Sequence, residues 1–151
     1  MSGLRRLRRK RRSQDRHLAR KHIMAKVLLI DDEPEFRTFV QRILECDGHN
    51  VTVADSRKFV AEAVTSGDFV SRFDIVVTDL LMPDIDSLET IYMLKRVNPE
   101  ARIIAMSGGG QLGAAEGCLQ VARRLGADRT LLKPFSVAEL QDAMGELLAA
   151  V

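Results

Sequence analysis

Apolar and polar positions follow a repeating order along the chain, in which short apolar runs alternate with segments of helical periodicity. Residues 27–30 are continuously apolar and end in two aspartates, as expected of a strand that is buried on both faces. Pro34 then opens a helical pattern that stops at Asp47-Gly48. The pattern predicts strands over residues 27–30, 51–54, 73–78, 102–106 and 129–132, and helices from Pro34, over 56–65, over 88–97, within 111–125 and from Ser136 onward.

The first and last of these helices each have one apolar stripe. In the first helix the spacing i, i+3, i+4, i+7, i+8 predicts a core-facing stripe of Phe36, Phe39, Val40, Ile43 and Leu44. Ser136 and Glu139 have the spacing of a capping box, which predicts the start of the last helix. The apolar face of that helix is expected at Val137, Leu140, Met144, Leu147 and Leu148.

Five strands that alternate with five helices predict an α/β fold. The expected architecture is a doubly wound, five-stranded parallel sheet of the (βα)5 type between two helical layers, a three-layer α/β/α domain. In such sheets ligands bind beyond the carboxyl ends of the strands. The residues that directly follow each strand are therefore the candidates for chemistry.

Charge divides the chain into two parts. Residues 1–25 carry ten Lys/Arg and one acidic residue, Asp15, whereas residues 26–151 carry thirteen Lys/Arg and twenty Asp/Glu, a formal net charge of −7. We interpret residues 1–25 as a basic, disordered extension that precedes a domain over 26–151, and either lies upstream of a natural start at Met24 or is a tail without function. An arm that binds nucleic acid and a targeting peptide are the alternatives.

The sequence argues against a membrane-spanning protein and against a secreted one. No apolar run approaches the length that a bilayer-spanning helix needs. The basic extension also lacks the apolar core of a secretory signal peptide. We therefore expect a cytoplasmic protein without a membrane partner.

Polar side chains with complementary charges follow four of the five predicted strands. Asp31 and Asp32 follow the first strand, Asp79 the third, Ser107 the fourth and Lys133 the fifth. Two carboxylates about 4 Å apart repel by roughly 4 kcal/mol at an effective dielectric constant near 20, so such a cluster requires a cation. Oxygen ligands with room for water and phosphate suit Mg²⁺. Taken alone, the two adjacent aspartates also fit helix caps, but the full constellation favours a site.

The motifs around these residues resemble those of a known family. They are Ile30-Asp31-Asp32-Glu33, Asp79-Leu80-Leu81-Met82-Pro83-Asp84, Met106-Ser107-Gly108 and Lys133-Pro134-Phe135. With them, residues 26–151 resemble the receiver domain of bacterial response regulators, the phosphorylated proteins of two-component systems, over the full length of the domain. The resemblance implies a flavodoxin-like fold and transfer of a phosphoryl group, with Mg²⁺, from the phosphohistidine of a histidine kinase or histidine phosphotransfer protein.

The resemblance also assigns the metal ligands. Asp32 is expected to bind Mg²⁺ directly and Asp31 partly through water. Asp79 is expected to contribute a carboxylate oxygen, and Leu81 its backbone carbonyl.

In the family, a further set of residues contacts the transferred phosphoryl group. The resemblance makes Asp79 the nucleophile and phosphoryl acceptor. Ser107 would donate a hydrogen bond to one phosphoryl oxygen, and Lys133 would neutralise another. The Lys133-Pro134 bond resembles one that is cis in the family.

Two departures from the family pattern change the expectations. An aromatic switch residue is common three residues before the lysine, where this chain has Thr130. Side chains that orient the hydrolytic water usually lie two residues after the acceptor and two after the hydroxyl, where this chain has Leu81 and Gly109. We therefore expect a long-lived phosphoryl-aspartate and an altered relay through Thr130.

The expected function is that of a single-domain response regulator that acts through phosphorylation-dependent protein binding. With no sequence beyond Val151, we expect no fused DNA-binding output domain at that end. A phosphatase of small molecules would place a second acid where Leu81 stands, so we expect a phospho-acceptor and not an enzyme with turnover. The alternative is a binding or adaptor module of the same fold that works without phosphate.

Overall fold

The computed structural model describes residues 24–54, 61, 68, 71–81, 87–108 and 113–149. Within these residues the order is β1 (Lys26–Ile30), α2 (Pro34–Cys46), β2 (Asn50–Ala54), β3 (Ile75–Asp79), α5 (Ser87–Val97), β4 (Arg102–Ser107), α6 (Ala114–Leu125), β5 (Arg129–Leu132) and α7 (Val137–Ala149). The helix predicted over 56–65 lies almost wholly outside the described residues, as do residues 1–23 of the basic extension.

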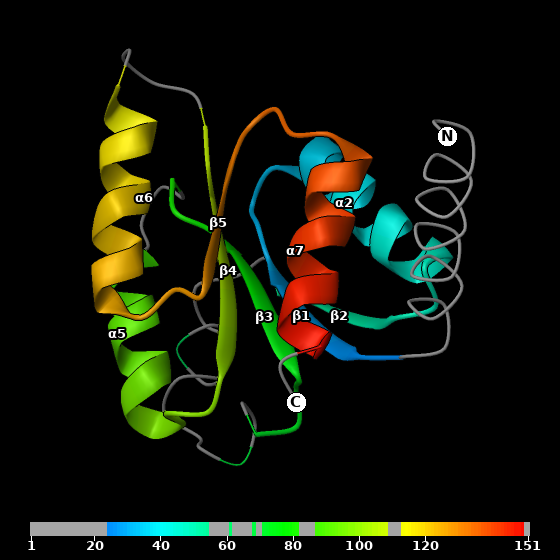
Figure 1. Ribbon diagram of the computed structural model, residues 1–151, viewed down its shortest axis with the longest axis horizontal. Helices are drawn as coiled ribbons and strands as arrows, with labels where there is room; N and C mark the ends of the chain where they lie inside the picture. The colour runs from blue at the N-terminus through cyan, green and yellow to red at the C-terminus, as the bar shows by residue number, and fades with distance from the viewer. Residues whose placement is uncertain are drawn as a thin grey trace, which may run out of the picture.

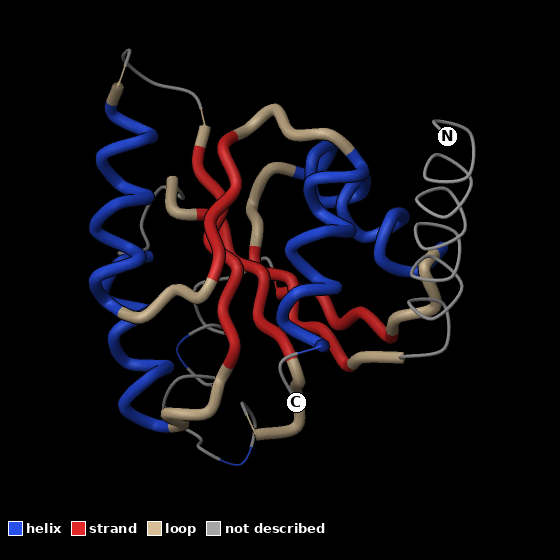
Figure 2. Tube along the Cα trace, viewed as in Figure 1, coloured by secondary structure: helices blue, strands red, loops and turns tan. Residues whose placement is uncertain are grey.

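The five strands form one parallel sheet in the order β2-β1-β3-β4-β5. Figure 2 shows the strands side by side between the helices, as the α/β prediction requires. The chain moves from β1 outward to β2 and then returns to β3 on the other side of β1. This reversal creates the topological switch point at which open α/β sheets bind ligands. It lies between β1 and β3, the strands that precede Asp31 and Asp79.

Helices cover both faces of the sheet (Figure 1). On one face α5 and α6 pack over a cluster that includes Leu28, Val76, Ile91, Ile103 and Leu119. On the other face α2 and α7 pack over a cluster that includes Val27, Val77, Ile104, Leu140 and Met144. Successive strand residues alternate between the two clusters because side chains alternate across a strand. The chain thus has the predicted three-layer α/β/α architecture.

Burial along the strands follows their place in the sheet. All five residues of β3 are buried, and β1 and β4 are each exposed or partly exposed only at their first residue. The outer strands β2 and β5 each include exposed positions. Continuous apolar runs therefore occur where a strand has neighbours on both sides and a helical layer on both faces.

Two residues of the predicted helix stripes are not in the core. Val40 and Leu44 of α2 are buried, but Phe39 is 39% exposed and Val137, at the start of α7, is 44% exposed. Both side chains line a surface groove between α2 and α7. The buried stripe of each helix is narrower than its apolar stripe, so the prediction for these two residues was wrong.

The helix termini follow the sequence signals. Ser136 Oγ accepts a hydrogen bond from Glu139 N at 3.1 Å, and Glu139 Oε2 accepts one from Ser136 N at 2.6 Å, which confirms the capping box. Gly126, with φ of +118°, ends α6 in the left-handed region that favours glycine. None of the helices in the described part of the chain is long and apolar enough to cross a bilayer.

Candidate functional site

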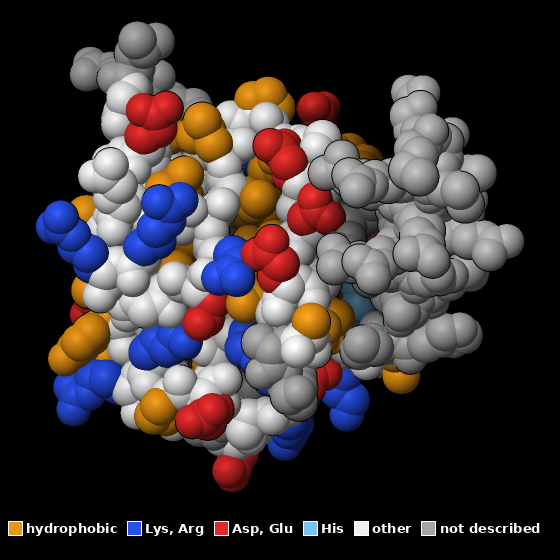
Figure 3. Space-filling view, in the orientation of Figure 1, with side chains coloured by type: hydrophobic (Ala, Val, Ile, Leu, Met, Phe, Trp, Pro, Cys, Tyr) orange, Lys and Arg blue, Asp and Glu red, His pale blue; other side chains and the backbone are white. Residues whose placement is uncertain are grey.

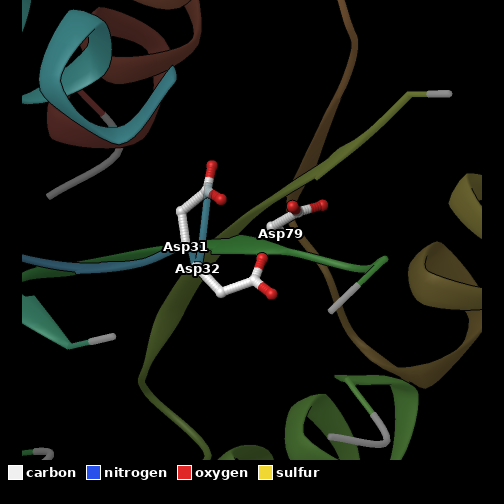
Figure 4. A group of neighbouring side chains, drawn as sticks. All are labelled: Asp31, Asp32 and Asp79. Atoms are coloured by element: carbon white, nitrogen blue, oxygen red, sulfur yellow. The ribbon is translucent and has the colours of Figure 1, made fainter. Parts of the chain in front are cut away.

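The residues predicted from the strand ends gather at one end of the sheet. Asp31 follows β1, Asp79 and Ser107 are the last residues of β3 and β4, and Lys133 follows β5. We call this the carboxyl end of the sheet, and the opposite side, where the strands begin, the amino end. Figure 4 shows the side chains of Asp31 and Asp32 beside that of Asp79 at the switch point.

The three aspartates form a compact cluster of oxygen atoms. One carboxylate oxygen from each of Asp31, Asp32 and Asp79 lies within 4.8 Å of the others. Asp31 and Asp79 are buried, with exposed fractions of 0% and 4%, and Asp32 is more open. Burial raises the pKa of the Asp31 carboxyl, and the neighbouring Asp79 adds to this shift, while the Glu33 backbone N–H and Lys133 oppose it. Burial therefore disfavours the charged form of the Asp31 carboxyl.

The ammonium group of Lys133 lies between two of these carboxylates. Lys133 Nζ donates hydrogen bonds to Asp31 Oδ2 at 3.1 Å and to Asp79 Oδ2 at 3.2 Å. Its side chain is only 10% exposed. Burial alone lowers the pKa of Lys133, but Asp79 and Asp31 together raise it above its ordinary value. The lysine is therefore charged at neutral pH, and it pairs with two of the three clustered carboxylates.

The backbone brings Lys133 to the end of β4. Lys133 N donates a hydrogen bond to Ser107 O at 2.8 Å, and the Lys133-Pro134 peptide bond is cis, as the resemblance implied. A Cβ atom on Gly108 would lie 2.3 Å from Lys133 Cβ, closer than side chains tolerate. The absence of a side chain at Gly108 thus permits the close approach of the two segments.

The hydroxyl group of Ser107 is buried without a partner. Ser107 has an exposed fraction of 0%, and its Oγ makes no hydrogen bond within the described part of the chain. A buried hydroxyl left unpaired costs about 1–3 kcal/mol, so native proteins rarely leave one without a reason. A ligand with an acceptor oxygen would remove this cost.

Leu81 and Glu33 complete the surroundings of the carboxylates. Leu81 N donates a hydrogen bond to Asp79 Oδ1 at 3.1 Å, which holds the carboxylate in place, while the Leu81 side chain is 40% exposed. The role of the Leu81 carbonyl as a metal ligand stays a prediction. Gly109, the other position at which a water-orienting side chain is missing, lies outside the described residues.

The helix-cap interpretation of the two adjacent aspartates is not supported. Glu33 is the N-cap residue of α2 and has no side-chain cap hydrogen bond. Asp31 Oδ1 accepts a hydrogen bond from Glu33 N at 2.9 Å, but its second oxygen faces Lys133. The Asp31 carboxylate therefore belongs to the cluster at the carboxyl end.

The hydroxyl group of Thr130, at the predicted switch position, faces α6. Thr130 Oγ1 accepts hydrogen bonds from two nitrogens of the Arg123 guanidinium, with the Nε contact at 2.9 Å. Arg123 was not singled out in the sequence, because its pairing with Thr130 depends on how α6 packs beside β5. The contact couples the switch position to the surface of α6.

Sequence reasoning also missed the place of Phe36 in the site. The helical period assigned Phe36 to the core stripe of α2, and it does pack against that core cluster. Its ring also lies under Lys133, with Nζ 4.1 Å from the ring centroid. The available signal was its position in the first turn of the helix that follows the acidic pair.

The donor set fits a hard divalent cation. All three clustered ligand groups are carboxylates, which suit Mg²⁺ better than softer metals. Lys133 pairs with only two of the three clustered carboxylates, so a metal cation would further reduce their repulsion. The unpaired Ser107 hydroxyl beside them fits an oxyanion. The site can thus accommodate both a metal ion and a phosphoryl group.

Comparison with known proteins agrees with this geometry. The response regulator receiver domain family matches residues 27–145. The chain is 34% identical over 120 residues to the transcriptional regulatory protein TcrA of Mycobacterium tuberculosis, a match that covers 76% of this chain and 42% of the relative. It thus spans less than half the length of that relative.

Two other similar proteins match over nearly their whole length. The chemotaxis protein CheY of Listeria monocytogenes is 32% identical over 121 residues, which cover 80% of this chain and 96% of the relative. A crystal structure of a response regulator receiver domain protein from Clostridium thermocellum has a TM-score of 0.74 and 27% identity, and covers 84% of this chain and 96% of that one. With its matched family, flavodoxin-like topology and strand-end motifs, the chain belongs to the response regulator receiver domains of two-component systems.

Proposed function

We propose that this receiver domain accepts a phosphoryl group on Asp79 from the phosphohistidine of a histidine kinase or histidine phosphotransfer protein. The phosphorylated form would then bind a protein target, in the cytoplasm where such donors act. One observation carries the proposal: a buried Ser107 hydroxyl, unpaired within the described part of the chain, lies at the same end of the sheet as three clustered carboxylates, two of which pair with the Lys133 ammonium.

The transfer is a displacement at phosphorus. An oxygen of the Asp79 carboxylate attacks the phosphorus atom, and a new O–P bond forms as the P–N bond to the donor imidazole breaks. The imidazole nitrogen leaves with the bonding electron pair. Negative charge spreads over the equatorial oxygens of the phosphoryl group, and cations and donors positioned beforehand stabilise it.

The residues of the chain supply most of this stabilisation. The Lys133 ammonium, now shared between Asp31 and Asp79, would neutralise one phosphoryl oxygen, and the Ser107 hydroxyl would donate to another. Asp31, Asp32, Asp79 and the Leu81 carbonyl would hold Mg²⁺, which when bound would supply a second cation to stabilise the charge on the phosphoryl oxygens.

The phosphoryl-aspartate is expected to persist. The Leu81 side chain, two residues after the acceptor, offers no polar group to orient an attacking water. The protein would therefore act as a phospho-acceptor with slow self-dephosphorylation and not as a phosphatase. Decay of the isolated phosphoprotein, followed by intact mass, is expected to be slow. Decay as fast as in rapidly self-dephosphorylating receivers would contradict this expectation.

The direct test is intact-mass spectrometry after incubation with Mg²⁺ and acetyl phosphate. We expect a labile gain of one phosphoryl group, about 80 Da, that is absent in the Asp79→Ala variant. A chain that begins at Met24 is expected to behave like the full chain, because the site lies wholly within the domain. No gain in a folded wild-type protein that binds Mg²⁺ would shift the assignment toward a donor-specific or phosphate-independent module.

One observation favours a second candidate, a receiver-fold adaptor that binds its partner without phosphate. The switch position holds Thr130 in place of the aromatic side chain of the family pattern, and its hydroxyl is engaged by Arg123 on α6. In that case partner binding would be equal for wild type and Asp79→Ala.

Charged side chains of both signs are mixed over the described part of the face in Figure 3, which gives nucleic-acid binding by this face no support.

A further inference from the structure

The Lys133 ammonium has four neighbours among the described residues. Two are the buried carboxylates of Asp31 and Asp79, at 3.1 and 3.2 Å. The third is Glu33 Oε2 at 3.7 Å, on a side chain that is 60% exposed. The fourth is the ring of Phe36, whose centroid lies 4.1 Å from Nζ. Such a contact is attractive because the face of an aromatic ring carries negative charge density.

These neighbours differ in whether they would keep their contact with Lys133 when a metal ion is bound. Asp31 and Asp79 are the same carboxylates that would hold Mg²⁺, so a bound metal ion would compete with the ammonium for their oxygens. Glu33 is solvated, and exposed ion pairs of this kind contribute little. An aromatic ring is no ligand for Mg²⁺, which prefers oxygen. Among the described contacts, the Phe36 ring is therefore the partly buried one that the metal leaves intact.

The Phe36 ring packs against a buried ring, that of Phe135. It packs edge-on against Phe135, with centroids 5.2 Å apart and an interplanar angle of 88°. The ring of Phe39 is also nearby, with centroids 5.7 Å apart and an interplanar angle of 50°. Phe135 is only two residues beyond Lys133 and is buried. The first turn of α2 thus packs against the segment that carries the lysine, and the ring presents its face to the ammonium.

We propose that Phe36 is a positioning residue for phosphoryl transfer. Its ring face keeps the Lys133 ammonium at the phosphoryl site when the carboxylates that now hold this ammonium turn to the metal. The inference rests on the proposed function of Asp79 and extends it to a residue outside the strand-end motifs. The property that matters is the aromatic face at position 36 and not the apolar volume.

The first arm of the test measures the rate of phosphorylation by acetyl phosphate with saturating Mg²⁺. Phe36→Leu keeps an apolar side chain but removes the ring, and we expect it to slow the reaction about threefold to tenfold. Phe36→Tyr keeps the ring and is expected to stay within about twofold of wild type. Phe39→Leu is the matched control on the same helix, since its ring contacts Phe36 and not Lys133, and it is also expected within about twofold.

The second arm uses the metal-free protein and needs no phosphorylation. Protons on the carbon next to Nζ of Lys133 lie near the ring face, so their NMR signals are expected upfield of those of other lysines. The upfield shift should persist in Phe36→Tyr and Phe39→Leu and vanish in Phe36→Leu. This arm separates the two proposals, because the shift is expected even if Asp79 accepts no phosphoryl group.

Three results would overturn the inference. One is a Phe36→Leu rate equal to wild type while its Lys133 signals lose the upfield shift, which would show that the contact exists without a role in transfer. Another is equal slowing in Phe36→Tyr and Phe36→Leu, which would assign the effect to packing. The third is a wild-type protein without the upfield shift, which would show that the ring does not hold the ammonium.

Discussion

The two ends of the sheet each hold a lysine against an aspartate, but the charges are balanced at only one of them. At the amino end, Lys95 of α5 donates to Asp128 Oδ2 at 3.2 Å and to the carbonyl oxygen of Ala101. Asp128 Oδ2 also accepts from Ile103 N at 2.8 Å. One cation meets one carboxylate, and the hydrogen bonds tie α5 to the starts of β4 and β5.

At the carboxyl end, Lys133 pairs with two of three clustered carboxylates, and a buried hydroxyl has no partner in the described part of the chain. The same residue types therefore serve two purposes. The balanced pair at the amino end is a structural connection between elements. The surplus of negative charge at the carboxyl end is destabilising by itself, which is expected where a site is completed by a cation and a phosphoryl group.

The largest expected contrast is between the two lysines. Lys133→Met removes the ammonium that would neutralise the transferred group, so we expect labelling by acetyl phosphate to slow by about a hundredfold. Lys95→Met is the matched control. It is expected to label within about twofold of wild type and to lose about 1–3 kcal/mol of unfolding free energy, because Asp128 and the Ala101 carbonyl lose a charged donor. Equal labelling rates in the two variants would remove the distinction between the two ends.

A smaller contrast of opposite sign is expected for the aspartates. Asp32→Asn removes one of three repelling charges and should raise the unfolding free energy of the metal-free protein by about 1 kcal/mol. Asp128→Asn leaves Lys95 without its carboxylate and should lower it by about 1 kcal/mol. Urea unfolding in EDTA measures both. Destabilisation by Asp32→Asn in metal-free buffer would contradict the idea of surplus charge.

The gain in stability on adding Mg²⁺ is expected to differ between the same two aspartate variants. Wild type and Asp128→Asn should be stabilised as Mg²⁺ is added, by about 1.4 kcal/mol for each tenfold increase above the dissociation constant. Asp32→Asn is expected to gain much less, because it has lost a ligand. Thermal unfolding over a magnesium series gives the three slopes. A slope for Asp32→Asn equal to that of wild type would exclude Asp32 as a ligand.

The smallest expected effect is a pH dependence at the amino end. His49 is buried, and its Nδ1 accepts a hydrogen bond from Ala25 N at 3.1 Å. Burial lowers the pKa of His49 below its ordinary value of 6.5, although Asp47 opposes this. The unfolded chain therefore binds the proton first, so this contribution to stability is present above about pH 6.5 and is lost as the pH falls.

His49→Asn offers the control, because its side-chain oxygen can still accept from Ala25 N but does not titrate. The difference in unfolding free energy between wild type and this variant should change between neutral pH and pH 5, in the direction of a less stable wild type. A constant difference over this range would show that His49 is not held neutral by its surroundings.

The sequence predicted the fold and the strand-end residues well because both depend on local signals. Continuous apolar runs mark the central strands, and parallel strands place the residues that follow them at one end of the sheet. Phe39 and Val137 were wrongly assigned to the core because helical periodicity marks an apolar stripe but not how much of its width a neighbouring layer covers.

The contacts of Phe36 with Lys133 and of Arg123 with Thr130 could not be predicted from the sequence, for a different reason. Each joins elements whose relative position is set by packing, and α2 and β5 are far apart in sequence. The surplus charge was visible in the sequence as a set of aspartates. Which of them the lysine would touch, and that the Ser107 hydroxyl would be left unpaired, required the arrangement in space.

The most direct test of the surplus-charge site is to map the phosphorylated residue with and without Mg²⁺. Wild-type protein is incubated with acetyl phosphate in Mg²⁺ or in EDTA, and peptides are analysed before the label decays. We predict a single phosphoryl group on the peptide that contains Asp79, formed in Mg²⁺ and absent in EDTA. A label on any other residue, or equal labelling of Asp79 in EDTA, would contradict the account.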